Sequence, residues 1–278
     1  MWEKKDKQCD PADPDDAFQG SYWDHVIIDP ETKLVVSLVV GKRNADTVVQ
    51  VFTDYYDRTD GSLPELITTD EYAVYLPVIL DTYGVLWREH PDFTEEDIEE
   101  FENNGLVELY FPEEIAYATV HKEREGNRVV EVTERVLLGT EEQVEQTLEG
   151  SSVSNTVNTS FVERYHATQR QFNARKKRKA YTFSKELQFH VAATWLVVVW
   201  YNFGWCVRTL REKVQDNPPR YHYRTPAMAA GLTDHSWSMR ELLSYPLFPP
   251  INPPQRPIRT YQDVLDRLER ANVEAPPD

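Results

Sequence analysis

Two carboxylates stand where a metal-dependent enzyme places oxygen ligands. Asp70 ends a short β-rich run at 66–69, where a side chain can point out from the carboxyl edge of a sheet. Glu163 lies in a segment of helical spacing, two turns before a dense basic run. Mg²⁺ prefers oxygen ligands, and two such ions about 4 Å apart can hold the attacking and leaving oxygens of a phosphodiester. The alternatives are that Asp70 caps the following helix and that Glu163 is an ordinary solvated residue.

The basic run is a second candidate site. It comprises Arg164, Arg170, Arg175, Lys176, Lys177, Arg178, Lys179 and Lys185. Aromatic residues stand among them, namely Tyr165, Phe172, Tyr181 and Phe183. Because basic side chains bind phosphates and interleaved rings stack on bases, this composition indicates nucleic acid binding. A solvated surface that balances the acidic half of the chain would have the same composition.

Charge is distributed unevenly along the 278 residues. The net charge of −17 alone argues against a nucleic acid partner. Residues 1–157 hold 12 Lys and Arg against 36 Asp and Glu, whereas residues 158–224 hold 13 against 4. A segment with a balance of +9 therefore lies inside an acidic chain, and its position matters more than the total.

The composition favours a globular, cytoplasmic protein. Hydrophobic residues make up 40% of the chain, enough for a core. Cys9 and Cys206 form no CxxC motif, which argues against a disulfide framework or zinc ribbon. The acidic segment 1–16 has no signal-peptide pattern. The apolar stretch 191–201 is shorter than the ~20 residues of a membrane span, so we expect a buried helix there and no membrane partner.

The hydrophobic pattern predicts alternating strands and helices. Two β-rich runs at 23–29 and 34–40 form a hairpin, and 44–56 has helical spacing. The strand that ends at Asp70 follows, and then a helix over 71–83.

The segment 85–157 is predicted to be an α+β insertion. An acidic helix with a capping-box pattern covers 94–101. Alternating runs at 115–122 and 128–138, separated by a Gly-Asn pair, predict a β-hairpin.

Two helices follow, one from 158 or 159 to about 175 and a long buried one from 184 to about 210. The expected parts are a first part of the core (1–84), the insertion (85–157), a helical part with Glu163 and the basic run (158–245), and a Pro-rich tail with a solvated helix (246–278).

This order fits an α/β, RNase H-like mixed sheet flanked by helices, without its first strand. That fold begins with three antiparallel strands, and its metal ligands lie on the first strand, at the end of the fourth and on a late helix. The runs at 23–29 and 34–40 serve as the second and third strands. Asp70 and Glu163 then take the second and third ligand positions.

Several short motifs occur in order along the chain: Val40-Gly-Lys-Arg43, Thr68-Thr-Asp-Glu-Tyr72 with Tyr75, Asn158-Thr-Ser-Phe-Val-Glu-Arg-Tyr165, Arg175-Lys-Lys-Arg-Lys179, Phe183-Ser-Lys185 with His190, and Arg224-Thr-Pro-Ala-Met-Ala-Ala-Gly231. With these motifs, residues 2–237 resemble insertion-sequence transposases related to insertion sequence one. No single motif carries the resemblance alone.

The resemblance implies a DDE-type transposase that cuts and joins DNA at element ends with Mg²⁺ or Mn²⁺. Asp70 matches the second Asp of the family's catalytic triad and Glu163 matches the Glu, so both are implied metal ligands. The basic run after the Glu is implied to lie against double-stranded DNA. The family also implies a cytoplasmic, nucleoid-associated protein and a homodimer or higher synaptic assembly.

The chain departs from the family at the first catalytic Asp. The family carries it in an Asp-Glu-x-Trp sequence, and Met1-Trp-Glu-Lys-Lys5 resembles the end of that strand. Three alternatives stay open: the chain is a truncated and inactive core, Asp29 or Asp24 supplies the third catalytic carboxylate, or no metal site forms. Asp29 would stand at the turn end of its strand, an unsuitable place for a ligand.

Two other functions fit the sequence. One is a non-catalytic DNA-binding remnant that uses only the basic run. The other is an acidic interaction protein whose N-terminal half mimics the charge of nucleic acid, which predicts no DNA binding even at low salt.

Overall fold

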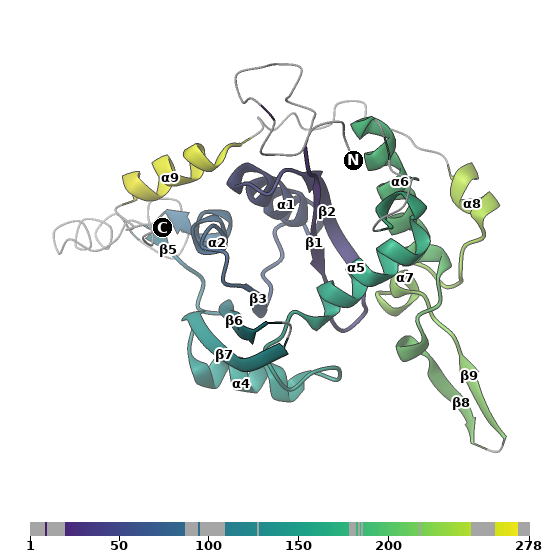
Figure 1. Cartoon of the computed structure of the whole chain (residues 1–278). Coiled ribbons are helices and arrows are strands. Elements are labelled where there is room, and N and C mark those ends of the chain that lie inside the picture. The colour runs from purple at the N-terminus through teal and green to yellow at the C-terminus, as the bar shows by residue number, and fades with distance from the viewer. Residues whose placement is uncertain are drawn as a thin grey trace. The chain divides into compact units, whose positions relative to one another are not determined.

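The computed structural model describes residues 9, 20–86, 94, 109–126, 128–177, 182, 184, 186–216, 218–245 and 259–271 (Figure 1). The chain divides into two compact units: unit 1 comprises 1–43 and 160–257, and unit 2 comprises 44–159 and 258–278. Of the boundaries expected from the sequence, only the one after residue 157 lies close to a unit boundary. Most of the predicted acidic helix at 94–101 and all of 246–257 lie outside the described residues.

Unit 1 contains two β-hairpins and a series of helices. Its elements are β1 (Trp23–Ile28), β2 (Val35–Gly41), α5 (Ser160–Phe172), η4 (Ala174–Lys176), α6 (Leu187–Val199), η5 (Trp200–Gly204), η6 (Arg208–Leu210), β8 (Glu212–Asp216), β9 (Pro219–His222), α7 (Pro226–Ala229) and α8 (Met239–Ser244). β1 pairs antiparallel with β2, and β8 with β9. The first hairpin was predicted from the sequence and is confirmed; the second was not predicted.

The core of unit 1 joins β2 to α5 and to the end of α6. Its buried residues are Val35, Leu38, Tyr165, Val198 and Tyr201. The rings of Tyr165 and Tyr201 meet edge to face, with centroids 5.1 Å apart. Asn202, in the π-helical turn η5, donates from Nδ2 to the carbonyl of Val35 at 2.9 Å and accepts from its amide at 3.1 Å. These two bonds fasten the helix end to β2.

The helix predicted to be buried is buried on one side only. Thr194 and Val198 are buried, whereas the side chain of Phe189 is 54% exposed. Among the described residues, Leu187–Leu210 is the one helical stretch long and apolar enough, by length and composition, to cross a membrane. In η5, which follows α6 directly, Tyr201 and Asn202 contact β2.

Unit 2 contains a three-stranded mixed sheet with helices. Its elements are α1 (Ala45–Arg58), β3 (Leu66–Asp70), α2 (Tyr75–Tyr83), β4 (Val85–Leu86), β5 (Leu109–Tyr110), β6 (Ala116–Glu125), β7 (Arg128–Leu138), α4 (Glu141–Gly150) and α9 (Tyr261–Arg270). The sheet order is β3-β6-β7, with β3 parallel to β6 and β6 antiparallel to β7. α1 begins as predicted, since Asn44 Oδ1 accepts from the amide of Thr47 at 3.2 Å.

The predicted hairpin of the insertion belongs to the main sheet of unit 2. β6 lies directly beside β3, with Thr69 opposite Thr119 and Asp70 opposite Val120. Buried residues of β6, Ala118 and Val120, pack in one cluster with Val144 of α4. The segment after residue 115 therefore shares a sheet with the strand that ends at Asp70.

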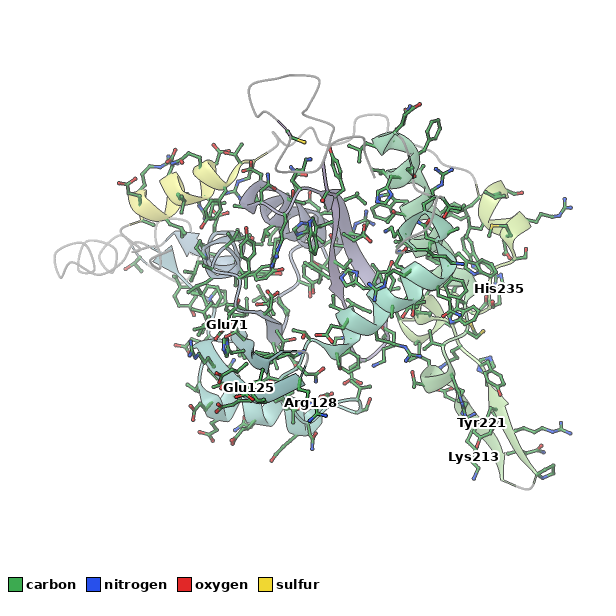
Figure 2. The ribbon with its side chains drawn as sticks, viewed as in Figure 1. Glu71, Glu125, Arg128, Lys213, Tyr221 and His235 are labelled. Atoms are coloured by element: carbon green, nitrogen blue, oxygen red, sulfur yellow. The ribbon has the colours of Figure 1, made fainter. Side chains whose placement is uncertain are left out.

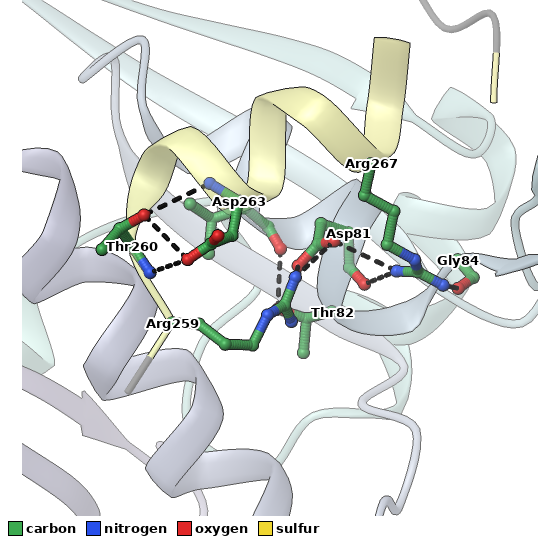
Figure 3. Close-up of polar contacts among 8 residues, drawn as sticks. Asp81, Thr82, Gly84, Arg259, Thr260, Asp263 and Arg267 are labelled. Carbon is green, nitrogen blue, oxygen red and sulfur yellow. Dashed lines mark hydrogen bonds and ion pairs between the residues drawn. The ribbon is translucent and has the colours of Figure 1, made fainter. Parts of the chain in front are cut away.

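The C-terminal helix α9 was expected to be solvated, and this expectation is wrong for one of its faces. Val264 and Leu268 are fully buried. Asp81 of α2, with a side chain only 1% exposed, forms ion pairs with Arg259 at 2.6 Å and Arg267 at 3.1 Å (Figure 3). The alternating charges of this segment made its apolar side, Val264 and Leu268, hard to recognise from the sequence. Nothing in the sequence indicated that Asp81 pairs with Arg259 and Arg267.

The fold is mixed α/β. The described strands pair in four groups, β1-β2 and β8-β9 in unit 1 and β3-β6-β7 and β4-β5 in unit 2. Within the described part of the chain, β1 pairs only with β2, and β3 only with β6.

Candidate functional site

Asp70 is the exposed last residue of β3. α2 begins at Tyr75, and its N-cap is Val74, which makes no side-chain cap hydrogen bond. Asp70 therefore does not cap the following helix, although it stands where the strand-to-helix turn begins.

The neighbours of Asp70 hold the end of β3 against β6. The hydroxyls of Thr69 and Tyr117 are 2.8 Å apart. Burial raises the pKa of Tyr117 to about 12, and the negative charge of Asp70 acts in the same direction. Glu71, labelled in Figure 2, pairs with His121 of β6 and with Arg135 of β7, the latter at 3.3 Å. Glu71 thus has a structural role, since its carboxylate holds the loop after β3 against β6 and β7.

Glu163 is exposed in the first turn of α5. The opposite side of the helix carries Tyr165 and Gln169, which are buried and hydrogen-bonded to each other. An acidic residue in the first turn is favourable because of the helix dipole. Core packing by Tyr165 therefore fixes which residues of α5 face solvent.

The described members of the basic run differ in their surroundings. Arg164 and Arg170 on α5 are exposed, as are Arg175 and Lys177 beyond it. Arg175 donates from Nη1 to the hydroxyl of Ser184 at 2.9 Å. Arg178, Lys179 and Lys185 lie outside the described residues.

Lys176 differs from its neighbours because it is buried. Its ammonium pairs with the carboxylate of Asp24 on β1, and the two side chains are 9% and 11% exposed. Burial lowers the pKa of Lys176, while Asp24 raises it. The sequence placed Lys176 on a DNA-facing surface and Asp24 among the candidate catalytic carboxylates. In the structure the two residues hold η4 against β1.

Asp29 has a structural role at the turn between β1 and β2. Its carboxylate accepts from the amide of Glu31 at 3.0 Å and from the amide of Thr32 at 3.3 Å. The Thr32 hydroxyl donates to it as well. Lys33 closes the turn with a φ of 61°. Asp29 therefore lies at the turn end of its strand, the position that was expected from the sequence to be unsuitable for a metal ligand.

Three histidines of unit 1 have lowered pKa values around the Asp24–Lys176 pair. The pKa of His166 on α5, of His190 on α6 and of His25 on β1 is lowered, in each case mainly by burial. Asp24 partly opposes this for all three. Sequence reasoning missed this buried polar group, because residues so far apart in sequence give no local signal.

No metal centre is complete within the described residues. No three His, Cys, Asp or Glu side chains among them gather closely enough to hold an ion. Asp70 belongs to unit 2, whereas Glu163, Asp24 and Asp29 belong to unit 1. Asp70 and Glu163 are exposed oxygen donors of the kind that Mg²⁺ takes, and on their own they do not make a ligand set.

No family model matches the chain, and neither a curated protein nor a solved structure matches it.

Proposed function

We propose that the chain is the catalytic core of a DDE-type DNA transposase, with Asp70 and Glu163 as two of its metal ligands and an RNase H-like arrangement of its elements. The observation that carries the proposal is the position of Asp70. It is exposed at the carboxyl end of β3, beside the parallel strand β6, and it caps no helix. This is the setting that the transposase order of elements requires of the second carboxylate.

The DNA-binding part of the proposal is supported by the surface of α5. Arg164 and Arg170 are exposed on the helix that carries Glu163, and Arg175 and Lys177 are exposed just after it. Phosphate contacts of this kind give affinity that is independent of sequence and sensitive to salt. Double-stranded DNA is therefore the proposed partner.

Mg²⁺ or Mn²⁺ is the proposed cofactor, held by Asp70 and Glu163 with a third carboxylate. The test is Mn²⁺ titration by calorimetry of the full chain and of the Asp70→Asn and Glu163→Gln variants. Glu145→Gln, an exposed acid on α4, is the matched control. We expect heat of binding in the parent and control and its loss in both site variants. Equal binding in all four proteins would remove Asp70 and Glu163 from the proposal.

A non-catalytic DNA-binding remnant is the second candidate. It is favoured by the lack of a three-ligand group among the described residues. Duplex binding that depends on Arg164 and Arg170, together with no Mn²⁺ binding and no metal-dependent nicking of DNA, would select it.

A further inference from the structure

The β8–β9 hairpin is a feature of unit 1 that the proposed function does not use. It extends away from the helices of unit 1 as a two-stranded ribbon (Figure 1). Val214 and Tyr221 are exposed on it, and Tyr223 is exposed just after it. An isolated hairpin buries little apolar surface, so its exposed rings are open to contact with another molecule.

One face of the hairpin is basic and aromatic. Lys213 stands directly opposite Tyr221 in the strand pairing, so both side chains lie on the same face (Figure 2). The guanidinium of Arg211 lies over the Tyr221 ring, 4.1 Å from its centroid. Tyr223 follows β9 directly, and extending the strand alternation by one residue assigns it to this face as well. We call Arg211, Lys213, Tyr221 and Tyr223 the ribbon face.

The acidic side chain of Glu212 lies on the opposite face. Glu212 stands across from His222 in the pairing and forms an ion pair with Arg224 at 2.9 Å. Glu212 is therefore separated from the two cations of the ribbon face.

We propose that the ribbon face binds an unpaired strand of DNA, with phosphates on Arg211 and Lys213 and a base stacked on Tyr223. The inference deepens the proposed function, since it takes DNA as the partner and adds a contact outside residues 164–185. The inference rests on the positive charges of Arg211 and Lys213 and on the exposed rings of Tyr221 and Tyr223.

The chemistry of each side chain suits a single strand. The Tyr223 side chain is 52% exposed, and stacking of a base on a tyrosine ring tolerates any sequence. The contact with Tyr221 orients the Arg211 guanidinium, which reduces the ordering needed to grip a phosphate. In duplex DNA the bases are stacked on each other, so the Tyr223 ring could not stack on a base and would not contribute to affinity.

A second copy of the chain is the competing occupant, because the open edges of a two-stranded sheet can accept another strand. Edge-to-edge pairing of two such ribbons would bring Lys213 and the arginines of one copy near those of the other. Like charges across a sheet are destabilising, so the charge pattern favours a polyanion.

The test is fluorescence anisotropy of the full chain with a labelled oligo-dT strand and with a labelled duplex of equal length. Tyr223→Ala should raise the Kd for the single strand about tenfold, and Tyr223→Phe should restore it because the ring remains. The double variant Arg211→Gln/Lys213→Gln should lower the salt slope for the single strand by about 1.4. Arg128→Gln on the acidic β6–β7 hairpin, also exposed (Figure 2), is the charge control and should change nothing.

An unchanged single-strand Kd in the hairpin variants would overturn the inference. So would an altered sedimenting mass without altered DNA affinity, which would assign the ribbon to a second copy. Arg164→Gln/Arg170→Gln separates the two proposals. If it weakens duplex binding while the hairpin variants have no effect, only the ribbon inference fails. If the hairpin variants weaken single-strand binding in a chain that binds no Mn²⁺, the inference stands and the catalytic proposal fails.

Discussion

Lys176 stands in a run of basic residues but differs from them in burial. A buried ion pair offsets the desolvation of both charges only while both partners are present. Removing the ammonium leaves the Asp24 carboxylate buried without its partner. The pair therefore matters to the stability of unit 1 even though Lys177 beside it is exposed.

Lys176→Met and Asp24→Asn should each lower the free energy of unfolding by about 3–5 kcal/mol, because each leaves one unpaired buried group. The double variant should lose less than the sum of the two. Lys177→Met is the matched control and should change stability by less than about 0.5 kcal/mol. Urea unfolding of the four variants measures these values. Additive losses in the double variant would contradict the pairing.

His166 makes stability depend on pH. Burial lowers its pKa below the usual 6.5, against the opposing effect of Asp24, and the charges of Lys176, Arg170 and His25 lower it further. As pH falls through 6.5, His166 therefore takes up a proton in the unfolded chain before it does so in the folded chain. Stability should be constant above this pH and should fall as pH decreases through 6.5 toward the folded pKa.

The measurement is urea unfolding at about pH 7.5 and about pH 5.5, on either side of the unfolded pKa. His166→Gln should reduce the difference between the two values, because glutamine does not titrate. His222→Gln on the exposed hairpin is the control and should keep the full difference. A difference that is equal in all three proteins would show that other groups cause it.

Elements with local signals were predictable, and elements that depend on distant partners were not. The cap at Asn44 and the hairpin turn at Gly126 are encoded within a few residues, and both are present. The parallel pairing of β3 with β6 joins segments about 50 residues apart, and periodicity carries no information about such pairing. The same applies to Asn202, whose amide bonds the backbone of Val35.

Arg267 of helix α9 is bonded to the end of α2. Arg267 donates to the Asp81 carboxylate and, at 3.0 Å, to the carbonyl of Gly84 at the end of α2. Arg267→Met should destabilise unit 2 by about 1–3 kcal/mol, since it leaves a buried acceptor without this donor. Arg270→Met, on the same helix and exposed, should cost less than about 0.5 kcal/mol. Equal urea midpoints for the two variants would exclude a structural role for the Arg267 contacts.

Across the chain, the sequence indicated which residues could carry chemistry but not which groups surround them. Asp70 and Glu163 are both exposed, as candidate ligands should be. Asp24 and Lys176 could not be recognised as a pair, because a charge run gives no information on burial. The ribbon face was missed because its cations are spread over a segment that looked like turns.

The opposed charges of the chain predict an unusual salt dependence of duplex binding. At about 0.1 M salt the Debye length is about 10 Å, so bound DNA interacts electrostatically mainly with the basic side chains it touches. At about 0.01 M the Debye length is about 30 Å. Bound DNA is then also repelled by the net negative charge of residues 1–157, which hold 36 Asp and Glu against 12 Lys and Arg. The logarithm of affinity should rise as salt falls and then flatten near about 0.01 M. Anisotropy over this range measures the curve. A constant slope would show that the acidic residues do not act on bound DNA, and no binding at any salt would favour an acidic interaction protein over a transposase.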